Sequence, residues 1–264
     1  MLACGLILPD PQQPARPKFT AEDLRNLYLE RGGEIFDVPL WKKISSLGGI
    51  SDEKYPERPF ERILEEYFGD CRLSELMRPL LVSSYDVQRS VPYFFKQHKA
   101  NKYGEINRDT DFLVRDVARA TTAAPTYFEA AHIRSLSNES FPLLDGGVFI
   151  NNPALSAYAE ARQIQFERYG RGRINCPTAK DMVLVSLGTG SSSDSYTHDD
   201  VKNWGSIQWI RPLINIMMNG VSQTVDFQLK QLFKAVEKPD QYVRLEPRLQ
   251  HASLAMDCAT EENH

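Results

Sequence analysis

Apolar and polar positions follow two periods along this chain, and together they predict an alternation of helices and strands. Between Phe60 and Phe68 the apolar side chains recur at helical spacing, which predicts an amphipathic helix ended by Gly69. A helix over 21–30, capped by Thr20, is also predicted. Further helices are predicted from 109 or 110 to 125, over 153–169, 212–219 and 222–235. Short apolar runs predict buried strands over 79–86, 142–144 and 182–187. The proline-rich segment 9–20 and the segment 31–58 are predicted to be irregular.

This order of elements indicates an α/β protein. Strands that alternate with helices are typical of a mainly parallel sheet covered by helices, which is the arrangement we expect. The 264 residues suit one large domain or two small ones. Because no internal repeat, low-complexity tract or linker interrupts the pattern, we expect a single domain over residues 1–264.

Composition and charge narrow the class of partner. With 42% hydrophobic and 25% charged residues, this is the composition of an ordinary globular protein. The net charge of -4 gives no electrostatic reason to expect nucleic acid. A membrane surface stays open as a partner, since an apolar patch can bind one without basic charge, but no apolar stretch reaches transmembrane length.

The cysteines and histidines predict neither a metal site nor a cofactor site. The four cysteines form no Cys-x-x-Cys pair, and the five histidines form no His-Glu-x-x-His motif. We therefore expect reduced thiols, no metal and no cofactor. We expect a cytoplasmic location, with peripheral attachment to membranes as an open alternative.

Asp145 is the candidate for chemistry. It follows the predicted strand 142–144, and Gly146 and Gly147 remove side chains beside it so that backbone or substrate can approach. A plain turn is the ordinary interpretation of Asp-Gly-Gly. Here, however, Asn152 and Pro153 begin a helix shortly afterwards, which fixes the carboxylate at a strand-to-helix junction. Asp145 is therefore a candidate catalytic base, with Gly146 and Gly147 shaping its surroundings.

A nucleophile for this base is missing from the sequence. The nucleophile elbow Gly-x-Ser-x-Gly does not occur, and its nearest approximation, 220–224, ends in Thr. Ser222 in that segment is predicted to be a helix cap. The run from Ser186 to Gly190 lacks the lysine of a phosphate-binding loop and is interpreted as a strand exit. The apolar segment 207–218 is predicted to pack in the core, with contact to lipid or an acyl chain as the alternative.

Several segments together resemble the patatin-like phospholipase family, in the order in which the family has them. They are Leu2-Ala3-Cys4-Gly5-Leu6, the region 54–76, Arg119-Ala120-Thr121-Thr122-Ala123-Ala124-Pro125-Thr126-Tyr127-Phe128, Asp145-Gly146-Gly147 with Asn151-Asn152-Pro153 behind it, Ser186-Leu187-Gly188-Thr189-Gly190, and Tyr242-Val243-Arg244-Leu245. The resemblance covers nearly the whole chain. Each motif is modest, but the ordered set is specific.

The resemblance implies a three-layer α/β/α fold and a lipid acyl hydrolase that uses a serine–aspartate dyad. Asp145 corresponds to the base of the dyad. The glycine-rich oxyanion loop and the serine elbow of the family have no counterpart in this sequence. We therefore expect an N-terminally truncated domain that is inactive and poorly stable as given. The implied partner is lipid, at a membrane surface or free of one, and head group, acyl length, acyl position and oligomeric state stay open.

Two other interpretations remain. One is a catalytically inactive patatin-like remnant or lipid-binding module that keeps the scaffold. The other is an unrelated α/β protein that uses Asp145 in phosphoryl chemistry, although Gly146 and Gly147 occupy the positions where a second carboxylate would be expected.

Overall fold

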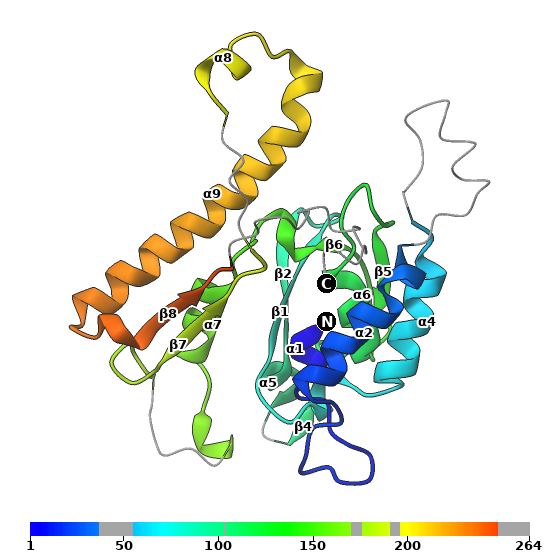
Figure 1. Ribbon diagram of the computed structural model, residues 1–264. Helices are drawn as coiled ribbons and strands as arrows, with labels where there is room; N and C mark the ends of the chain where they lie inside the picture. Colours follow the sequence, from blue (N-terminus) through cyan, green and yellow to red (C-terminus); the bar gives the residue numbers. More distant parts are fainter. Residues whose placement is uncertain (37–54, 103, 170–175, 191–195, 248–264) are drawn as a thin grey trace. The chain divides into compact units, whose positions relative to one another are not determined.

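The chain forms an α/β structure made of two compact units. The computed structural model describes residues 1–36, 55–102, 104–169, 176–190 and 196–247 (Figure 1). The first unit runs from Met1 to Val148 and the second begins at Phe149. The predicted α/β class is confirmed. The single domain and the three-layer arrangement stay predictions. Among the described residues, no helix is long and apolar enough to cross a membrane.

A four-stranded sheet forms the centre of the first unit. Its strands are β1 (Leu81–Asp86), β2 (Val91–Lys96), β5 (Ala131–Arg134) and β6 (Ser140–Asp145), and their order is β2-β1-β6-β5. Each neighbouring pair is antiparallel. A separate two-stranded pairing joins β3 (Asn101–Lys102) to β4 (Glu105–Ile106), also antiparallel.

The expectation of a mainly parallel sheet is wrong for this sheet. Residues 87–90 join β1 to β2, and residues 135–139 join β5 to β6. Such short connections can only form hairpins, because parallel neighbours need a crossover of a dozen residues or more. The sequence pattern did not predict β2 and β5, so neither hairpin was anticipated. Parallel pairing occurs in the second unit, between β7 (Leu184–Leu187) and β8 (Tyr242–Leu245), whose connection includes a long helix.

Helices cover one face of the four-stranded sheet. Helix α6 (Val114–Thr121) packs on β1, β5 and β6, and α4 (Glu57–Phe68) packs on α6 (Figure 1). Helix α2 (Ala21–Ile35) packs on α4 and is capped, as predicted, by Thr20. The short helices α1 (Leu2–Gly5) and α5 (Gln97–Ala100) and the 3-10 turns Leu73–Glu75 and Gly146–Val148 complete the unit.

Two of these helices differ in length from their predictions for identifiable reasons. Helix α2 continues beyond residue 30 because Ile35 and Gly32 are buried in the core. Helix α6 starts later than predicted because the Asp111 carboxylate holds the backbone N–H and hydroxyl of Ser74, at 3.0 and 2.6 Å. That contact fixes the chain before α6 in a non-helical course.

An aromatic cluster fills the core under the sheet. Phe95, Phe112 and Phe141 are buried, and the rings of Phe95 and Phe112 meet edge-on with centroids 5.0 Å apart. Tyr93 packs on Phe95 at 5.0 Å and on Phe141 at 5.1 Å. This arrangement fixes the register between β1, β2 and β6, because one slipped residue would turn the rings to the opposite face.

The second unit has its own smaller core. It contains α7 (Ala154–Ala161), the 3-10 turn Phe166–Tyr169, β7, α8 (His198–Val201), α9 (Ser206–Ala235), the turn Pro239–Gln241 and β8. Leu229 and Phe233 of α9 are fully buried and pack with Ala154, Ala179 and Tyr242. Helix α7 is shorter than the predicted 153–169.

Helix α9 replaces the two helices predicted over 212–219 and 222–235. Pro212 lies inside this helix and does not divide it. Gly220 does not divide it either, because a glycine in a helix costs only about 1 kcal/mol relative to alanine. Ser222 is a buried mid-helix residue, and its assignment as a helix cap is wrong. The expected core packing of segment 207–218 is also wrong for Leu213, Ile214, Ile216 and Met217, which are exposed.

Candidate active site

Strand β6 carries Asp145 at its final position. Asp145 lies opposite Ser84 of β1 in the antiparallel register, and its backbone N–H donates to the Ala123 carbonyl at 2.9 Å. One strand and the segment after α6 therefore hold the backbone of this residue from two sides. The predicted position at the end of a strand, followed by a turn, is what the structure shows.

The Asp145 carboxylate is half-buried and has one backbone donor. The Gly147 N–H donates to its Oδ1 atom at 2.7 Å. Burial raises the pKa of Asp145 above its ordinary value, although the Gly147 hydrogen bond opposes this rise. A carboxylate with a raised pKa is a better proton acceptor. Asp145 is thus suited to remove a proton from a hydroxyl brought within hydrogen-bond reach.

Gly146 fits a space that no side chain could share. A Cβ atom at this position would lie 2.2 Å from Ser83 Oγ and 2.5 Å from the Ser83 carbonyl oxygen. The close approach brings the Asp145–Gly147 turn directly against β1. The sequence identified the glycine, and the structure shows that contact with β1 is the reason for it.

Hydroxyl groups of β1 and α6 secure the same junction. Ser84 is fully buried, and its hydroxyl contacts the carbonyls of Leu144 at 2.5 Å and Ala120 at 3.2 Å. The Thr121 hydroxyl donates to the Ser83 carbonyl at 2.7 Å. These contacts tie β6 and α6 to β1 immediately beside Asp145. Sequence analysis missed them, although Thr121 lies within the segment that resembles the family.

Within residues 1–36, 55–102 and 104–148 of the first unit, no serine, threonine or cysteine side chain donates a hydrogen bond to Asp145. The serines nearest in register, Ser83 and Ser84, contact backbone or glycine instead. The described residues of the first unit thus provide a base with no hydroxyl or thiol hydrogen-bonded to it. In the described ranges no group of three His, Cys, Asp or Glu side chains could hold a metal ion.

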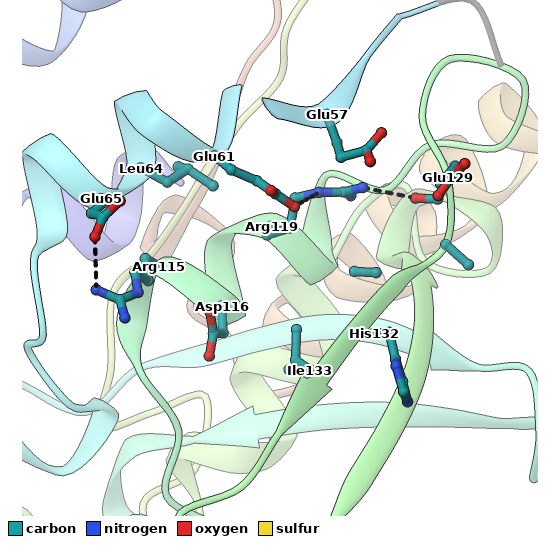
Figure 2. Close-up of a pocket in the computed structure, with 12 residues that line it drawn as sticks. Glu57, Glu61, Leu64, Glu65, Arg115, Asp116, Arg119, Glu129, His132 and Ile133 are labelled. Atoms are coloured by element: carbon teal, nitrogen blue, oxygen red, sulfur yellow. Dashed lines mark hydrogen bonds and ion pairs between the residues drawn. The ribbon is translucent and has the colours of Figure 1, made fainter. Parts of the chain in front are cut away.

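A separate cavity of about 420 Å³ lies on the first unit between α4, α6 and β5 (Figure 2). Arg119 is buried in its wall, donates to the Glu129 carbonyl at 3.0 Å and lies 3.4 Å from the Glu61 carboxylate. Glu57, Glu65 and Asp116 also line it, and burial raises the pKa of Asp116. This cavity is predominantly acidic and holds no Ser, Thr or Cys among its lining residues.

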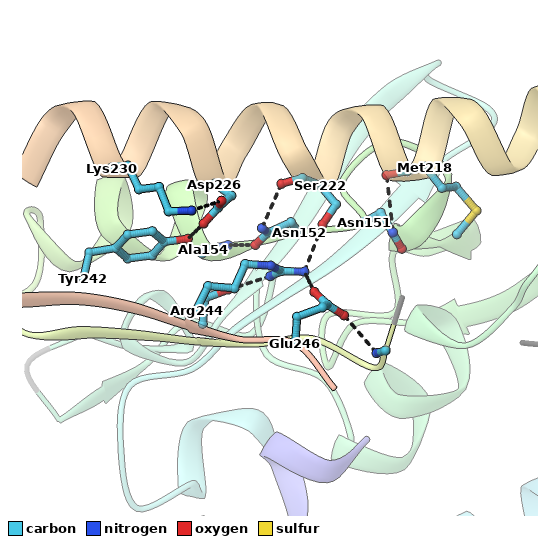
Figure 3. Close-up of polar contacts among 12 residues, drawn as sticks. Asn151, Asn152, Ala154, Met218, Ser222, Asp226, Lys230, Tyr242, Arg244 and Glu246 are labelled. Carbon is cyan, nitrogen blue, oxygen red and sulfur yellow. Dashed lines mark hydrogen bonds and ion pairs between the residues drawn. The ribbon is translucent and has the colours of Figure 1, made fainter. Parts of the chain in front are cut away.

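The second unit contains a polar network that sequence analysis did not find. Arg244 of β8 donates to Ser186 Oγ at 2.8 Å and to Ser222 Oγ at 3.0 Å, and it forms an ion pair with Glu246 (Figure 3). Glu246 in turn accepts from the Gly190 N–H at 2.9 Å. The network therefore holds the Ser186–Gly190 segment in place as a strand exit, in agreement with its predicted role.

Comparison with known proteins identifies the family. The family model described as patatin-like phospholipase matches residues 1–158, which include Asp145. The chain is 29% identical over 262 residues to Patatin-11 of Solanum tuberosum, covering 96% of this chain and 65% of that protein. It is 27% identical over 271 residues to Patatin-like protein 1 of Arabidopsis thaliana, covering 96% and 64%. The chain belongs to the patatin-like phospholipase family.

A further relative is named as lacking activity. "Probable inactive patatin-3-Kuras 1" of Solanum tuberosum is 27% identical over 243 residues, which cover 89% of this chain and 62% of that protein. The chain spans just under two thirds of the length of the curated relatives it matches.

Proposed function

We propose that this chain is part of a lipid acyl hydrolase in which Asp145 is the catalytic base of a serine–aspartate dyad. Membership of the patatin-like phospholipase family supports the class of reaction. The observation that carries the proposal is the position of Asp145, a half-buried carboxylate with a raised pKa at the rigid end of β6. The Gly147 N–H orients one carboxylate oxygen and leaves the other available for a donor.

The proposed reaction proceeds in two halves. Asp145 accepts the proton of a serine hydroxyl as its oxygen attacks the ester carbonyl of a lipid, and a tetrahedral oxyanion forms. Collapse of this intermediate breaks the ester bond, the leaving alcohol takes the proton from Asp145, and an acyl-enzyme remains. Water then attacks the acyl-enzyme, Asp145 accepts its proton, and return of that proton to the serine releases the fatty acid.

This proposal requires a serine that the 264 residues do not supply in the family's motif. A dyad works only when its hydroxyl lies within hydrogen-bond reach of the base. We therefore propose that a Gly-x-Ser-x-Gly elbow and a glycine-rich oxyanion loop precede this sequence in the natural protein, and that these 264 residues are inactive without them. The natural coding sequence upstream of codon 1 tests this directly.

The alternative is an inactive patatin-like protein that keeps the scaffold. The relative named as probably inactive, which matches 89% of this chain, gives this alternative its support. A stop codon directly upstream of codon 1, without an in-frame elbow, would favour it.

Hydrolysis of a soluble short-acyl ester tests the role of Asp145. We expect no turnover by the 264-residue chain and measurable turnover by a chain extended through the elbow. In the extended chain, Asp145→Asn is expected to lower kcat by about 10²-fold or more, because general-base transfer contributes that much. KM should change far less, since Asn keeps the acceptor for the Gly147 N–H.

Glu139→Gln is the matched control, because it also neutralises one carboxylate but lies on the exposed connection between β5 and β6. It should leave kcat unchanged. Turnover by the 264-residue chain that Asp145→Asn abolishes would reveal a nucleophile among these residues. Normal turnover by the extended Asp145→Asn protein would refute the assigned role.

A further inference from the structure

Helix α9 presents an exposed apolar face over its first half. Leu213, Ile214, Ile216 and Met217 are all at least 46% exposed, and Met217 is 60% exposed. At about 3.6 residues per turn, these four residues fall on one broad side of the helix. Figure 1 shows α9 as one long helix, drawn from yellow to orange. An apolar face of this kind, left uncovered on a helix, marks an interaction surface.

This face points away from the side of α9 that packs within the second unit. Ser222, Leu229 and Phe233 are buried, and they share the opposite side of the helix by the same periodicity. Ser222 and Asp226 contact Arg244 and Tyr242 of β8 on that side, as Figure 3 shows. Helix α9 is thus anchored by its second half, while the apolar face of its first half remains uncovered within this unit.

An aromatic cluster lies at the start of the same helix. The ring of Trp204 meets Trp209 at 5.0 Å and Tyr196 at 5.1 Å, both edge-on. Trp209 is one helical turn before Leu213, so the cluster adjoins the apolar face. Tryptophan and tyrosine side chains favour the boundary between hydrocarbon and water, because one part of each ring system is apolar and another is polar.

The charge pattern of this segment suits a phospholipid surface. From Lys202 to Val225 the sequence contains two basic residues and no Asp or Glu, although the whole chain has 35 acidic residues and a net charge of -4. Lys202 forms an ion pair with Asp199 at 2.7 Å. A segment without carboxylates avoids repulsion from lipid phosphates, and its apolar face can enter the acyl boundary.

We propose that the first half of α9, together with Trp204 and Trp209, docks this protein on a phospholipid surface. The helix lies in the plane of the surface, Leu213, Ile214, Ile216 and Met217 enter the boundary of the acyl chains, and the aromatic rings sit at head-group depth. This inference rests on the proposed function in one respect, because a lipid acyl hydrolase has to reach a substrate held in such a surface.

Co-sedimentation with vesicles tests the docking surface without requiring catalysis. The vesicles contain diether phosphatidylcholine and diether phosphatidylglycerol, which have no acyl ester bond to cleave. The 264-residue chain is expected to bind them. Ile214→Asp with Met217→Asp should weaken binding by about tenfold or more, because binding strength follows the apolar area that enters the boundary.

The matched control is Asn215→Asp with Asn219→Asp, which adds the same charge at exposed polar positions in the same half of α9, on the side away from the apolar face. It should bind vesicles like the original chain. Circular dichroism establishes whether each variant keeps its helices. Equal loss of binding in both double variants would show that charge alone is responsible and would overturn the proposal.

A second measurement needs no change in α9. In a Trp41→Phe chain, only Trp204 and Trp209 emit, and brominated diether lipids should quench them on binding. Binding without quenching would place the contact elsewhere and refute the proposal. If the chain does not bind vesicles but self-associates, and Ile214→Asp with Met217→Asp abolishes the self-association, then the apolar face binds a second copy of the chain and the proposal is refuted. The soluble-ester assay of the extended chain is independent of these outcomes, so the two proposals can fail separately.

Discussion

At the scale of single residues, Asp145 combines a buried carboxyl group with a rigid backbone. Burial raises its pKa because desolvation disfavours the charged form, and the single Gly147 hydrogen bond offsets only part of that effect. The ionised form of Asp145 therefore makes the folded state less stable than the protonated form does. The same raised pKa makes the carboxylate a better base. Strained or costly groups of this kind are characteristic of functional sites.

This cost predicts how stability depends on pH. The folded pKa of Asp145 lies above its unfolded value near 3.8, so the folded state binds more protons between these two values. Stability contributed by the protonated form is present below 3.8 and is lost as pH rises through the folded pKa. Asp145→Asn should therefore make the chain more stable than the original at neutral pH and equally stable in acid. Urea midpoints across this range measure the difference, and a variant that is less stable at neutral pH would contradict the cause assigned to the shift.

Gly146 provides a second prediction at this scale. Gly146→Ala places a methyl group against the Ser83 backbone, which cannot easily retreat from the centre of a sheet. We expect a loss of about 1–3 kcal/mol in the free energy of unfolding, measured by urea denaturation.

Gly33→Ala is the matched control, because Gly33 lies in α2 with no atom within 4 Å of the added methyl group. This substitution should stabilise the helix by about 0.5–1 kcal/mol. If both substitutions shift stability in the same direction, close contact with Ser83 is not what requires Gly146.

At the scale of secondary-structure elements, β7 and β8 form a parallel pair with one face uncovered within the second unit. Val183, Val185 and Leu187 are exposed at alternate positions on and beside β7, and Val243 and Leu245 are exposed on β8. Parallel strands are normally buried on both faces. An exposed apolar strand row of this kind favours self-association.

Two lysines on this row test that expectation. Val185→Lys with Leu187→Lys should reduce the concentration-dependent self-association of the 264-residue chain, measured by light scattering. Gln163→Lys with Gln228→Lys is the control, since it makes the same change in charge at exposed polar positions. Both variants move the net charge from -4 toward zero, which by itself favours association. A reduction confined to the β7 variant therefore reports the apolar face, and equal behaviour of the two variants would contradict it.

At the scale of the whole molecule, two compact units carry the features of the family. The first holds Asp145, the aromatic core and the segment that the family model matches, except for residues 149–158, which belong to the second unit. The second holds the Arg244 network and α9, beyond residue 158. The relatives align with both units, since the matches to Patatin-11 and Patatin-like protein 1 each cover 96% of the chain.

The sequence alone determined the features that local chemistry specifies. The Thr20 cap of α2, the amphipathic helix α4, the strand at 81–86 and the place of Asp145 at a strand end all follow from spacing and capping within a few residues. Each has a strong local signal, because side-chain periodicity and turn residues act over one or two helical turns.

Tertiary structure decided what depends on residues far apart in the chain. The antiparallel order β2-β1-β6-β5 arises from hairpins whose partner strands carry no clear alternation in sequence. Two sets of contacts also join segments that are far apart in the sequence: Gly146 with Ser83, and Arg244 with Ser186 and Ser222. Helix α9 likewise runs without a break through two segments that the sequence pattern predicted as separate helices. Pairing and burial choose among locally acceptable conformations, so only the folded chain reveals which apolar residues are covered and what holds Asp145 in place.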